Sequence, residues 1–382
     1  MRNSIKPGQV WLDTNGKRIQ AHAGAIIYEN GVYYWYGENK EFTNEKRKVW
    51  TSGIRSYSSK DLYNWNDEGL IIPPNEVDKR SPMHPSRRND RPHILYNKGT
   101  RKYVCWIKEI EKGYHILAAD KLLGPYNMVN PDYRPLGKAA GDFDLAQDEV
   151  TGKAYLYFSH KQECVITVEL TEDYMAATSN CRQFYEGLYP PFCREGITHL
   201  FRGGKHYLLT SGMIGYIPNP SVVAVSDDWL GPFETQGNPH INDDSCASFN
   251  SQASSIFKHP HKEDCYFVLA DRWVPDFVVT RERYEWLTRV IGSNFDKKYK
   301  ASLKEKLALL KTPIMAKANT SMADYVWLPV RFEGERLLID WQDEWQLICI
   351  PECALPKYCR SFSSKFEKSE LWRFPGILRL SI

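Results

Sequence analysis

Five polar residues stand at the start of similar segments along the chain, and their types could support acid–base chemistry. Each is followed by an apolar run, a turn and a second apolar run rich in β-formers, which is typical of a β-hairpin. In order they are His22, Asp90, Asp142, Glu195 and Gln252, and they are 68, 52, 53 and 57 residues apart. A carboxylic acid can protonate a leaving oxygen while a second polar group activates water. If these residues converged, they could therefore hydrolyse a glycosidic bond.

The spacing of the five units indicates the fold that must position these residues. Each unit has room for four strands, and five such units fit a β-propeller better than a β-sandwich, in which turn signals would follow single strands. In a propeller the innermost strand of every blade lines the central channel, so the five residues would meet at one end of the axis. We therefore predict an all-β, five-bladed β-propeller over residues 1–347.

One region departs from this repeat. Residues 280–320 are rich in helix formers, with three leucines at helical spacing, namely Leu303, Leu307 and Leu310. We expect a helical insertion there, between the last blade and a closing hairpin over residues 325–341 that completes the ring and removes an exposed sheet edge. The tail over residues 348–382 has no clear period, and we assign it no role.

Composition narrows the classes of function. Of 382 residues, 42% are hydrophobic and 25% are charged, and the net charge of +3 gives no indication of a nucleic-acid or membrane-surface partner. The 12 Trp and 23 Tyr are an unusually large share, and aromatic residues both suit strands and stack on the C–H faces of sugars. The expected partner is therefore an oligo- or polysaccharide.

Other features argue against a cofactor, a metal or a membrane span. The nine Cys form no pair of CxxC motifs, and no nucleotide-binding glycine motif or serine hydrolase elbow occurs. No run of ~18 apolar residues is present, and the first seven residues lack the apolar core of a signal peptide. We expect no cofactor, and a location that is either cytoplasmic or that of a mature secreted or periplasmic form.

Glu195 is the best candidate for a general acid. It begins an inner strand, where a neighbouring Asp142 would raise its pKa by like-charge repulsion, whereas on its own it would read as a surface residue at a strand start. Side chains alternate along a strand, so only one of Asp142 and Asp144 can face the channel. We favour Asp142 because it stands at the strand start.

The remaining polar candidates have two interpretations each. Asp90 and Glu38 could bind sugar hydroxyls, but Asp90 could instead cap a turn before Pro92, and Glu38 could pair with Lys40. Three histidines could bind a metal ion only if they converge, and otherwise read as buried side chains with satisfied hydrogen bonds. They are His22, His93 and His199.

Seven segments of the chain form a specific set of motifs when they are taken together: Pro7–Thr14, Gln20–Gly24, Tyr33–Glu38, Arg91-Pro92, Asn250–Gln252, Asp271–Trp273 and Tyr325–Pro329. This set resembles glycoside hydrolase family 43, and in particular its exo-β-1,3-galactanase-like branch. The resemblance covers residues 7 to about 347, apart from 280–320. It implies an enzyme that inverts the configuration at the anomeric carbon, with a water-sized gap of roughly 6.5–9.5 Å between the acid and the group that holds the water.

The resemblance also implies roles for individual residues. In most of family 43 an Asp near the start of the first blade activates the water, but here the segment Gln20–Gly24 has no Asp, a loss that the galactanase-like branch shares. By this resemblance Gln252 holds the attacking water through an imidic-acid form, Glu195 is the general acid and Asp142 tunes its pKa. The implied substrate-binding residues are Glu38, Asp90, Tyr114, Glu186 and Tyr216.

Two departures from the branch bear on sugar specificity. The branch usually has Thr-Gly-Trp where this chain has Ile214-Gly215-Tyr216, which removes one hydroxyl and gives a smaller stacking platform, and Asp90 is shorter than the Glu expected there. We predict an inverting exo-glycosidase that releases galactose from β-1,3-linked galactan or arabinogalactan-type glycans. The alternatives are an α-L-arabinofuranosidase or β-xylosidase of the same family, and a catalytically silent propeller that only binds glycan.

Overall fold

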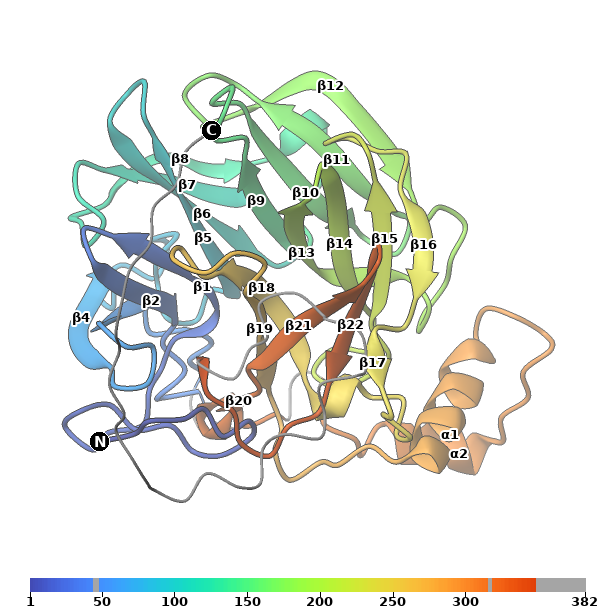
Figure 1. Cartoon of the computed structure of the whole chain (residues 1–382). Helices are drawn as coiled ribbons and strands as arrows, with labels where there is room; N and C mark the ends of the chain where they lie inside the picture. The colour runs from blue at the N-terminus through green and yellow to red at the C-terminus, as the bar shows by residue number, and fades with distance from the viewer. Residues whose placement is uncertain (44–47, 315–317, 348–382) are drawn as a thin grey trace, which may run out of the picture. The chain divides into compact units, whose positions relative to one another are not determined.

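Five sheets arranged around a common axis make up the part of the chain that the computed structural model describes, residues 1–43, 48–314 and 318–347 (Figure 1). The tail over residues 348–382 lies outside the described residues. Each of the first four sheets contains four strands in sequence order, and we number these sheets as blades 1 to 4. Blade 1 has β1 (His22–Glu29), β2 (Val32–Glu38), β3 (Ile54–Ser59) and β4 (Asn66–Ile72). Blade 2 has β5 (Asn89–Asn97), β6 (Lys102–Glu109), β7 (Tyr114–Ala119) and β8 (Asn127–Tyr133).

Blades 3 and 4 repeat this order. Blade 3 has β9 (Phe143–Gln147), β10 (Ala154–His160), β11 (Cys164–Leu170) and β12 (Ala177–Phe184), and blade 4 has β13 (Arg194–Arg202), β14 (Lys205–Gly212), β15 (Val222–Ser226) and β16 (Glu234–Gly237). The innermost strands β1, β5, β9, β13 and β18 contact one another in this order, and β18 returns to β1. This closed ring confirms the predicted all-β, five-bladed β-propeller.

Blade 5 is assembled from segments that are far apart in the sequence. Its strands are β18 (Gln252–Lys258), β19 (Tyr266–Arg272), β21 (Leu328–Glu333) and β22 (Arg336–Asp340), with β20 (Asp324–Tyr325) paired to β19. The short β17 (His240–Ile241), which precedes β18 in the chain, pairs in parallel with β22 at the outer edge. The predicted closing hairpin corresponds to β21 and β22, which form the outer half of the last blade. In this blade β21 pairs with the outer side of β19.

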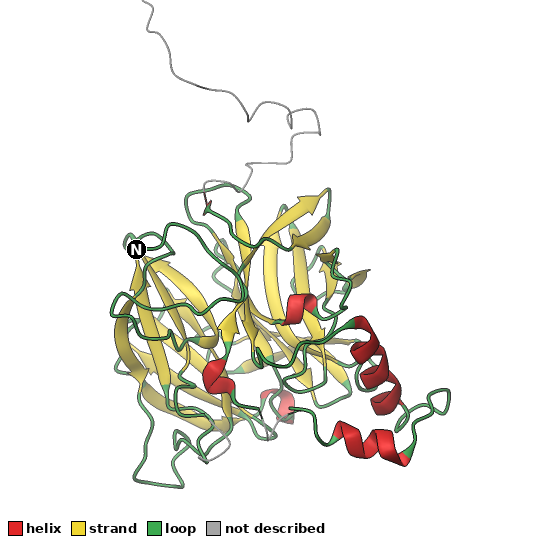
Figure 2. Ribbon diagram, turned by 90° about the horizontal axis from the view of Figure 1, so that it is seen from below, coloured by secondary structure: helices red, strands yellow, loops and turns green. Residues whose placement is uncertain are grey.

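Two α-helices, α1 (Arg281–Gly292) and α2 (Leu303–Leu309), lie between β19 and β20, so this helical segment interrupts blade 5 instead of following it. Three 3-10 turns complete the described elements: η1 (Pro135–Gly137), η2 (Ser248–Asn250) and η3 (Thr320–Met322). Figure 2 shows both α-helices at the periphery of the strands. Neither described helix has the length and apolarity that a membrane span requires.

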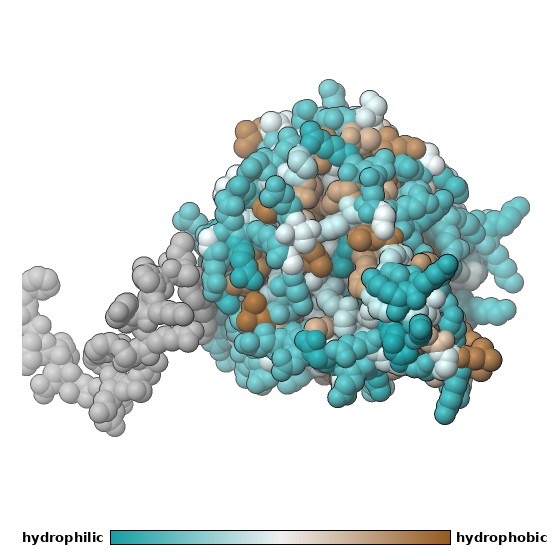
Figure 3. All heavy atoms as spheres, turned by 90° about the vertical axis from the view of Figure 1, so that its right-hand side faces the viewer, coloured by the Kyte–Doolittle hydropathy of each residue, from teal (hydrophilic) through white to brown (hydrophobic). Residues whose placement is uncertain are grey.

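The leucine spacing predicts a helix correctly, but the leucines do not bury an apolar face. Leu303 is 75% exposed and Leu307 is 54% exposed, and α2 has no buried residue. A capping box defines the start of α2, because Ser302 and Glu305 each accept a hydrogen bond from the other's backbone N–H. Figure 3 shows the side of the molecule that lies on the right in Figure 1. Hydrophilic side chains cover most of this side, with hydrophobic ones scattered among them.

Much of the high tryptophan content is structural. Trp35, Trp65 and Trp327 are almost fully buried where blade 1 meets blade 5, and Trp11 from the N-terminal segment packs with them. The ring of Trp35 lies 4.5 Å from that of Trp327 and 5.4 Å from that of Trp65, in edge-on contacts. This cluster holds the first and last blades together.

Replacing Trp35 by Ala is expected to lower the free energy of unfolding by about 3–5 kcal/mol, because a buried side chain of this size leaves a cavity that its neighbours fill only in part. Urea denaturation followed by far-UV circular dichroism measures the loss. Trp341, which is 37% exposed, provides a control, and its replacement by Ala should cost much less. Equal losses for the two variants would contradict the assignment of Trp35 to the joint between the blades.

Candidate active site

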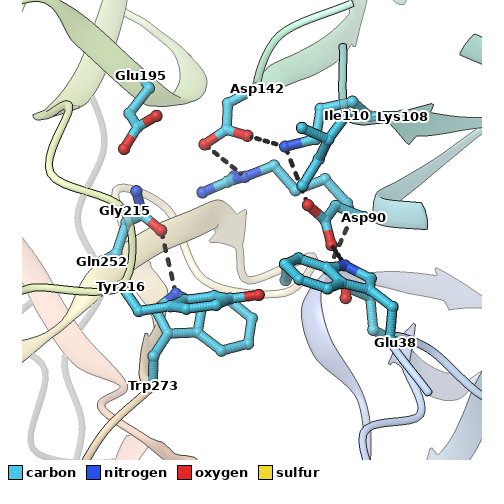
Figure 4. A pocket seen from close by; sticks show the side chains of 13 residues that line it. Glu38, Asp90, Lys108, Ile110, Asp142, Glu195, Gly215, Tyr216, Gln252 and Trp273 are labelled. Atoms are coloured by element: carbon cyan, nitrogen blue, oxygen red, sulfur yellow. Dashed lines mark hydrogen bonds and ion pairs between the residues drawn. The ribbon is translucent and has the colours of Figure 1, made fainter. Parts of the chain in front are cut away.

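A pocket of about 130 Å³ opens at the end of the axis where the inner strands begin (Figure 4). Four of the five predicted strand-start residues line it, namely Asp90, Asp142, Glu195 and Gln252. Glu38 also lines it, because β2 runs antiparallel to β1 and ends where β1 begins. The pocket thus contains at least one residue from each of the five blades. Of the predicted strand-start residues, only His22 does not line it, because its side chain is fully buried.

Bulges at the strand starts shape this end of the propeller. In blades 1, 2 and 4 the register of the inner strand shifts directly after the predicted residue. The residue that follows lies in the left-handed region, with φ of 48° at Ala23, 49° at Arg91 and 60° at Gly196. Such bulges bend a strand and change the direction of its side chains. In blades 2 and 4 the residue directly before the bulge, Asp90 or Glu195, lines the pocket, whereas His22 of blade 1 does not.

Asp142 is bound by two cations and one backbone N–H. Lys108 Nζ lies 2.5 Å from its Oδ1, Arg91 Nε lies 3.1 Å from its Oδ2, and the Gly196 backbone N–H donates to the same Oδ2 at 3.0 Å. Although burial opposes the charged form, these two cations hold the pKa of Asp142 below its usual range. Asp142 is therefore ionised over the whole physiological range.

Glu195 has the opposite protonation behaviour. Burial, and then the negative charge of Asp142, raise the pKa of Glu195 from its ordinary 4.5 to about 8, since both disfavour a further negative charge in the site. Figure 4 shows its carboxyl group at the pocket next to Asp142 and Gln252. Glu195 carries a proton at neutral pH, which a general acid requires.

Two hydrogen bonds fix the amide of Gln252. Its Oε1 accepts from the Trp273 indole N–H at 3.1 Å, and its Nε2 donates to Ser211 Oγ at 2.8 Å. The indole nitrogen can only donate, so the orientation of the amide follows from its partners. A carbonyl oxygen has two lone pairs, and the second one on Oε1 remains for a water or a sugar hydroxyl.

The pocket wall formed by blades 1 and 2 contains a network of buried charges. Lys40 Nζ lies 2.5 Å from Glu38 Oε2 and 3.6 Å from Asp90 Oδ1, and Lys108 Nζ lies 3.2 Å from Asp90 Oδ2. Burial raises the pKa of Glu38 to about 7, even though Lys40 opposes the shift. Glu38 therefore both pairs with Lys40 and lines the pocket. Asp90 accepts a hydrogen bond from the Trp50 indole at 2.5 Å, which places it in the pocket wall.

Sequence comparison assigns the chain to a known family. The family described as glycosyl hydrolases family 43 matches residues 20–290, which is more than half of the chain. The chain belongs to glycosyl hydrolase family 43. This confirms the predicted family and indicates a glycoside hydrolase. Among curated protein sequences, nothing matches the chain.

Several solved structures of family 43 resemble this chain. The β-1,3-galactosidase BT0265 has a TM-score of 0.72 at 28% identity, and the match covers 91% of this chain and 64% of BT0265, so this chain spans less than two thirds of that protein. The β-1,3-galactosidase BT3683 with galactodeoxynojirimycin has a TM-score of 0.70 at 24% identity, with coverage of 90% and 100%. An exo-β-1,3-galactanase from Phanerochaete chrysosporium with β-1,3-galactotriose has a TM-score of 0.70 at 20% identity, with coverage of 90% and 68%. The predicted resemblance to the galactanase-like branch is confirmed by these neighbours.

Two substrate-binding residues that the family resemblance implies lie outside the pocket. Tyr114 is fully buried in β7, its ring packs on Phe143, and its hydroxyl donates to the Gly141 carbonyl at 2.9 Å. Glu186 is exposed in the loop that follows β12. Tyr114 supports the backbone that carries Asp142 and has no surface for a sugar, so the structure corrects that assignment. A sugar contact by the exposed Glu186 stays a prediction.

The three histidines do not converge. His22 Nδ1 lies 2.9 Å from Asp271 Oδ1, His93 Nδ1 lies 3.2 Å from Asp144 Oδ1, and His199 Nε2 lies 3.1 Å from His206 Nδ1. Each therefore has its own polar partner, although His93 Nε2 has none and His199 is only partly buried. Within the described ranges, no group of three or more His, Cys, Asp or Glu is arranged to hold a metal ion.

Two register partners of the strand-start residues belong to the site but were not predicted from the sequence: Lys108 lines the pocket, and Ser211 holds the amide of Gln252. Opposite Asp90 stands Lys108, and opposite Glu195 stands Ser211. Each of these partners stands one residue before the end of its strand, and Lys108 follows the apolar run Tyr103–Ile107. A polar residue at the end of such a strand is the signal that could have found them.

Replacing Gly196 by Ala is expected to disturb the family 43 site through two effects. The φ of 60° strains a non-glycine residue, and the added Cβ would lie 2.6 Å from Ser211 Oγ and 3.0 Å from Gln252 Nε2. Gly204 provides a matched control, because its φ is 80° and nothing lies within 4 Å of a Cβ there. Both variants should lose roughly 1–3 kcal/mol of stability in urea denaturation, but only Gly196→Ala should lose turnover. Equal turnover would contradict a site that depends on the position of Gln252.

Proposed function

We propose that this family 43 chain is an inverting, exo-acting glycoside hydrolase that releases galactose from β-1,3-linked galactan or arabinogalactan-type glycans. The observation that carries the proposal is the pairing, in one pocket, of a protonated carboxylic acid, Glu195, with an amide of fixed orientation, Gln252. The galactose-type choice is supported by the neighbours, which are β-1,3-galactosidases and exo-β-1,3-galactanases by name.

In the proposed reaction Glu195 gives its proton to the glycosidic oxygen while the bond from that oxygen to the anomeric carbon breaks. The water held by Gln252 attacks the anomeric carbon from the opposite face, which inverts its configuration. The imine nitrogen of the imidic-acid form of Gln252 takes a proton from this water while its Oε1–H proton passes to solvent, which leaves an ordinary amide. The amide tautomerises back to the imidic acid before the next turnover. Solvent returns a proton to Glu195. The expected gap between the two groups is roughly 6.5–9.5 Å, enough for the water.

In the proposed mechanism the role of Asp142 is to remain negatively charged. Its ionised carboxylate helps to keep the proton on Glu195, and it stays ionised because Lys108 and Arg91 bind it. Glu38, Asp90 and Tyr216 line the same pocket and are proposed to bind the galactose. The two carboxylates offer acceptors for sugar hydroxyls, and the aromatic ring of Tyr216 offers a face for C–H groups.

Proton NMR of the first-formed product tests this function. β-1,3-Galactobiose and β-1,3-galactan should release galactose first as the α-anomer, since attack on the opposite face inverts a β-linkage. Aryl α-L-arabinofuranoside and aryl β-xyloside are the comparison substrates. Release of pentose alone would favour the other activities of family 43, and binding of galactobiose without any release would make the chain a glycan-binding propeller.

A further inference from the structure

The helical segment, which we define as residues 281–314, contacts the loop that carries the pocket residue Tyr216, although it lies at the periphery of the blades (Figure 2). We propose that this segment sets the position of Tyr216 and thereby determines which sugars the site accepts. The choice of test sugars rests on the proposed function, whereas the positioning of Tyr216 does not.

A backbone hydrogen bond joins the helical segment to the pocket. The Ile314 carbonyl accepts from the Tyr216 backbone N–H at 2.8 Å. The preceding residue, Gly215, has φ of 59°, and a Cβ there would lie 2.4 Å from the Ile314 carbonyl oxygen. The two backbones therefore approach so closely that only glycine fits between them. This contact fixes Tyr216 at its main chain.

Apolar packing supports the same loop. Ile214 and Ile217, on either side of Tyr216, are buried in one cluster with Leu287 of α1. Ile314 and Leu309 are partly buried against this cluster. The loop that carries Tyr216 runs between β14 and β15 with no strand of its own. Asn219 holds the C-terminal part of this loop by hydrogen bonds to Gly212 and Ile217, and the contacts with the helical segment hold the part around Tyr216.

The helical segment also contacts the loop that leads to Glu195. Tyr189 donates its hydroxyl to Asp296 Oδ2 at 2.7 Å, and its ring stacks on Phe295 with a centroid distance of 5.9 Å. Four residues after Tyr189 the chain reaches Cys193, directly before β13. One peripheral segment thus holds two loops at the pocket.

Tyr216 occupies a position where a small shift changes the shape of the pocket. Its ring centroid lies 6.1 Å from that of Trp50 and 5.4 Å from that of Trp273. Figure 4 shows Tyr216 and Trp273 on the side of the pocket opposite Asp142. The three rings form a wall for the apolar face of a sugar, and the position of that wall determines the room left for the substituents of the ring. We therefore expect the helical segment to act on KM and sugar choice, with little effect on the acid Glu195.

Ile314→Ala tests the proposal, with Leu303→Ala as the control, because Leu303 belongs to the same segment but is 75% exposed. Hydrogen exchange by mass spectrometry should show faster exchange of the Tyr216 amide in Ile314→Ala and no change in Leu303→Ala. KM for β-1,3-galactobiose should rise roughly threefold to tenfold in Ile314→Ala with kcat little changed, which is the size of effect expected for a displaced aromatic contact. Gly215→Ala, which forces the two backbones apart, should show both effects if Ile314→Ala proves unstable.

A double-mutant cycle shows whether the effect passes through Tyr216. In a Tyr216→Ala background, Ile314→Ala should leave KM unchanged. Unchanged exchange of the Tyr216 amide in both Ile314→Ala and Gly215→Ala would overturn the proposal, as would a KM effect of Ile314→Ala that persists in the Tyr216→Ala background. If the wild-type chain releases no sugar, the proposed function fails. The exchange data, together with the Kd of galactose followed by tryptophan fluorescence in the same variants, then decide the positioning role alone.

Discussion

Glu195→Gln is expected to lower kcat on β-1,3-galactobiose by roughly 10²–10⁴-fold, the usual contribution of a general acid. Gln has nearly the same shape as a protonated Glu but has no proton to give to the leaving oxygen. The loss should be much smaller on an aryl β-galactoside with an acidic phenol, because that leaving group departs without protonation. Initial rates on both substrates measure the difference. Equal losses on both would contradict the role of acid.

Glu149→Gln provides the matched control for this substitution. Glu149 is exposed in the turn between β9 and β10, at the end of blade 3 away from the pocket, so the same chemical change should leave both rates unchanged. In the wild type, kcat/KM should fall as pH rises through about 8, where Glu195 loses its proton. This alkaline fall should be absent from the residual activity of Glu195→Gln.

Stability gives a second measurement that needs no substrate. The pKa of Glu195 is about 8 in the folded chain, compared with an ordinary value of 4.5. The folded chain therefore holds a proton that the unfolded chain releases between these pH values. The contribution of Glu195 is fully present below pH 4.5 and is lost as pH rises through about 8, with a slope of roughly 1.4 kcal/mol per pH unit. Urea denaturation of Glu195→Gln at several pH values should show a flatter decline than the wild type.

The repeat of strand-start residues was sufficient to predict the propeller and the end of the axis where the pocket lies. This prediction succeeds because the sequence shows one polar residue at the start of each hairpin. In any ring of blades the inner strands surround the axis, so these starts lie near one another. The register partners Lys108 and Ser211 could not be predicted in the same way. A bulge directly after Asp90 and after Glu195 shifts the pairing, and a shift of one residue reverses which side chains face the pocket.

The error over Tyr114 has a physical cause of the same kind. Tyr114 lies on the third strand of blade 2, where a side chain points into the packing between blades and not toward the axis. The leucines of α2 have the spacing of a core-facing helix, but periodicity indicates only that they share a face. Whether that face is covered depends on the tertiary contacts of the segment. The proposed role of Gln252, which is to hold the attacking water, comes from the family resemblance. An amide at the start of a strand does not by itself indicate such a role.

Asp142→Asn is expected to have the largest effect on stability within the site. It leaves Lys108 and Arg91 buried without their closest carboxylate, and removing one partner of a buried ion pair costs about 3–5 kcal/mol. In the wild type the pKa of Asp142 is held low, so its contribution is present above its unfolded pKa and is lost as pH falls through the lower folded value. Urea denaturation at neutral and acid pH should therefore show a difference between wild type and Asp142→Asn that narrows toward acid pH.

The same variant should shift the pH profile of activity. Without the negative charge of Asp142, the pKa of Glu195 falls, and the remaining cations Lys108 and Arg91 lower it further. The alkaline fall of kcat/KM should therefore move to lower pH, which a purely structural role of Asp142 would not produce. In the double variant Asp142→Asn with Lys108→Met, part of the stability should return, since one uncompensated charge is gone. An unmoved alkaline limb in Asp142→Asn would show that Glu195 keeps its proton through burial alone, and that Asp142 acts only as an anchor for the two cations.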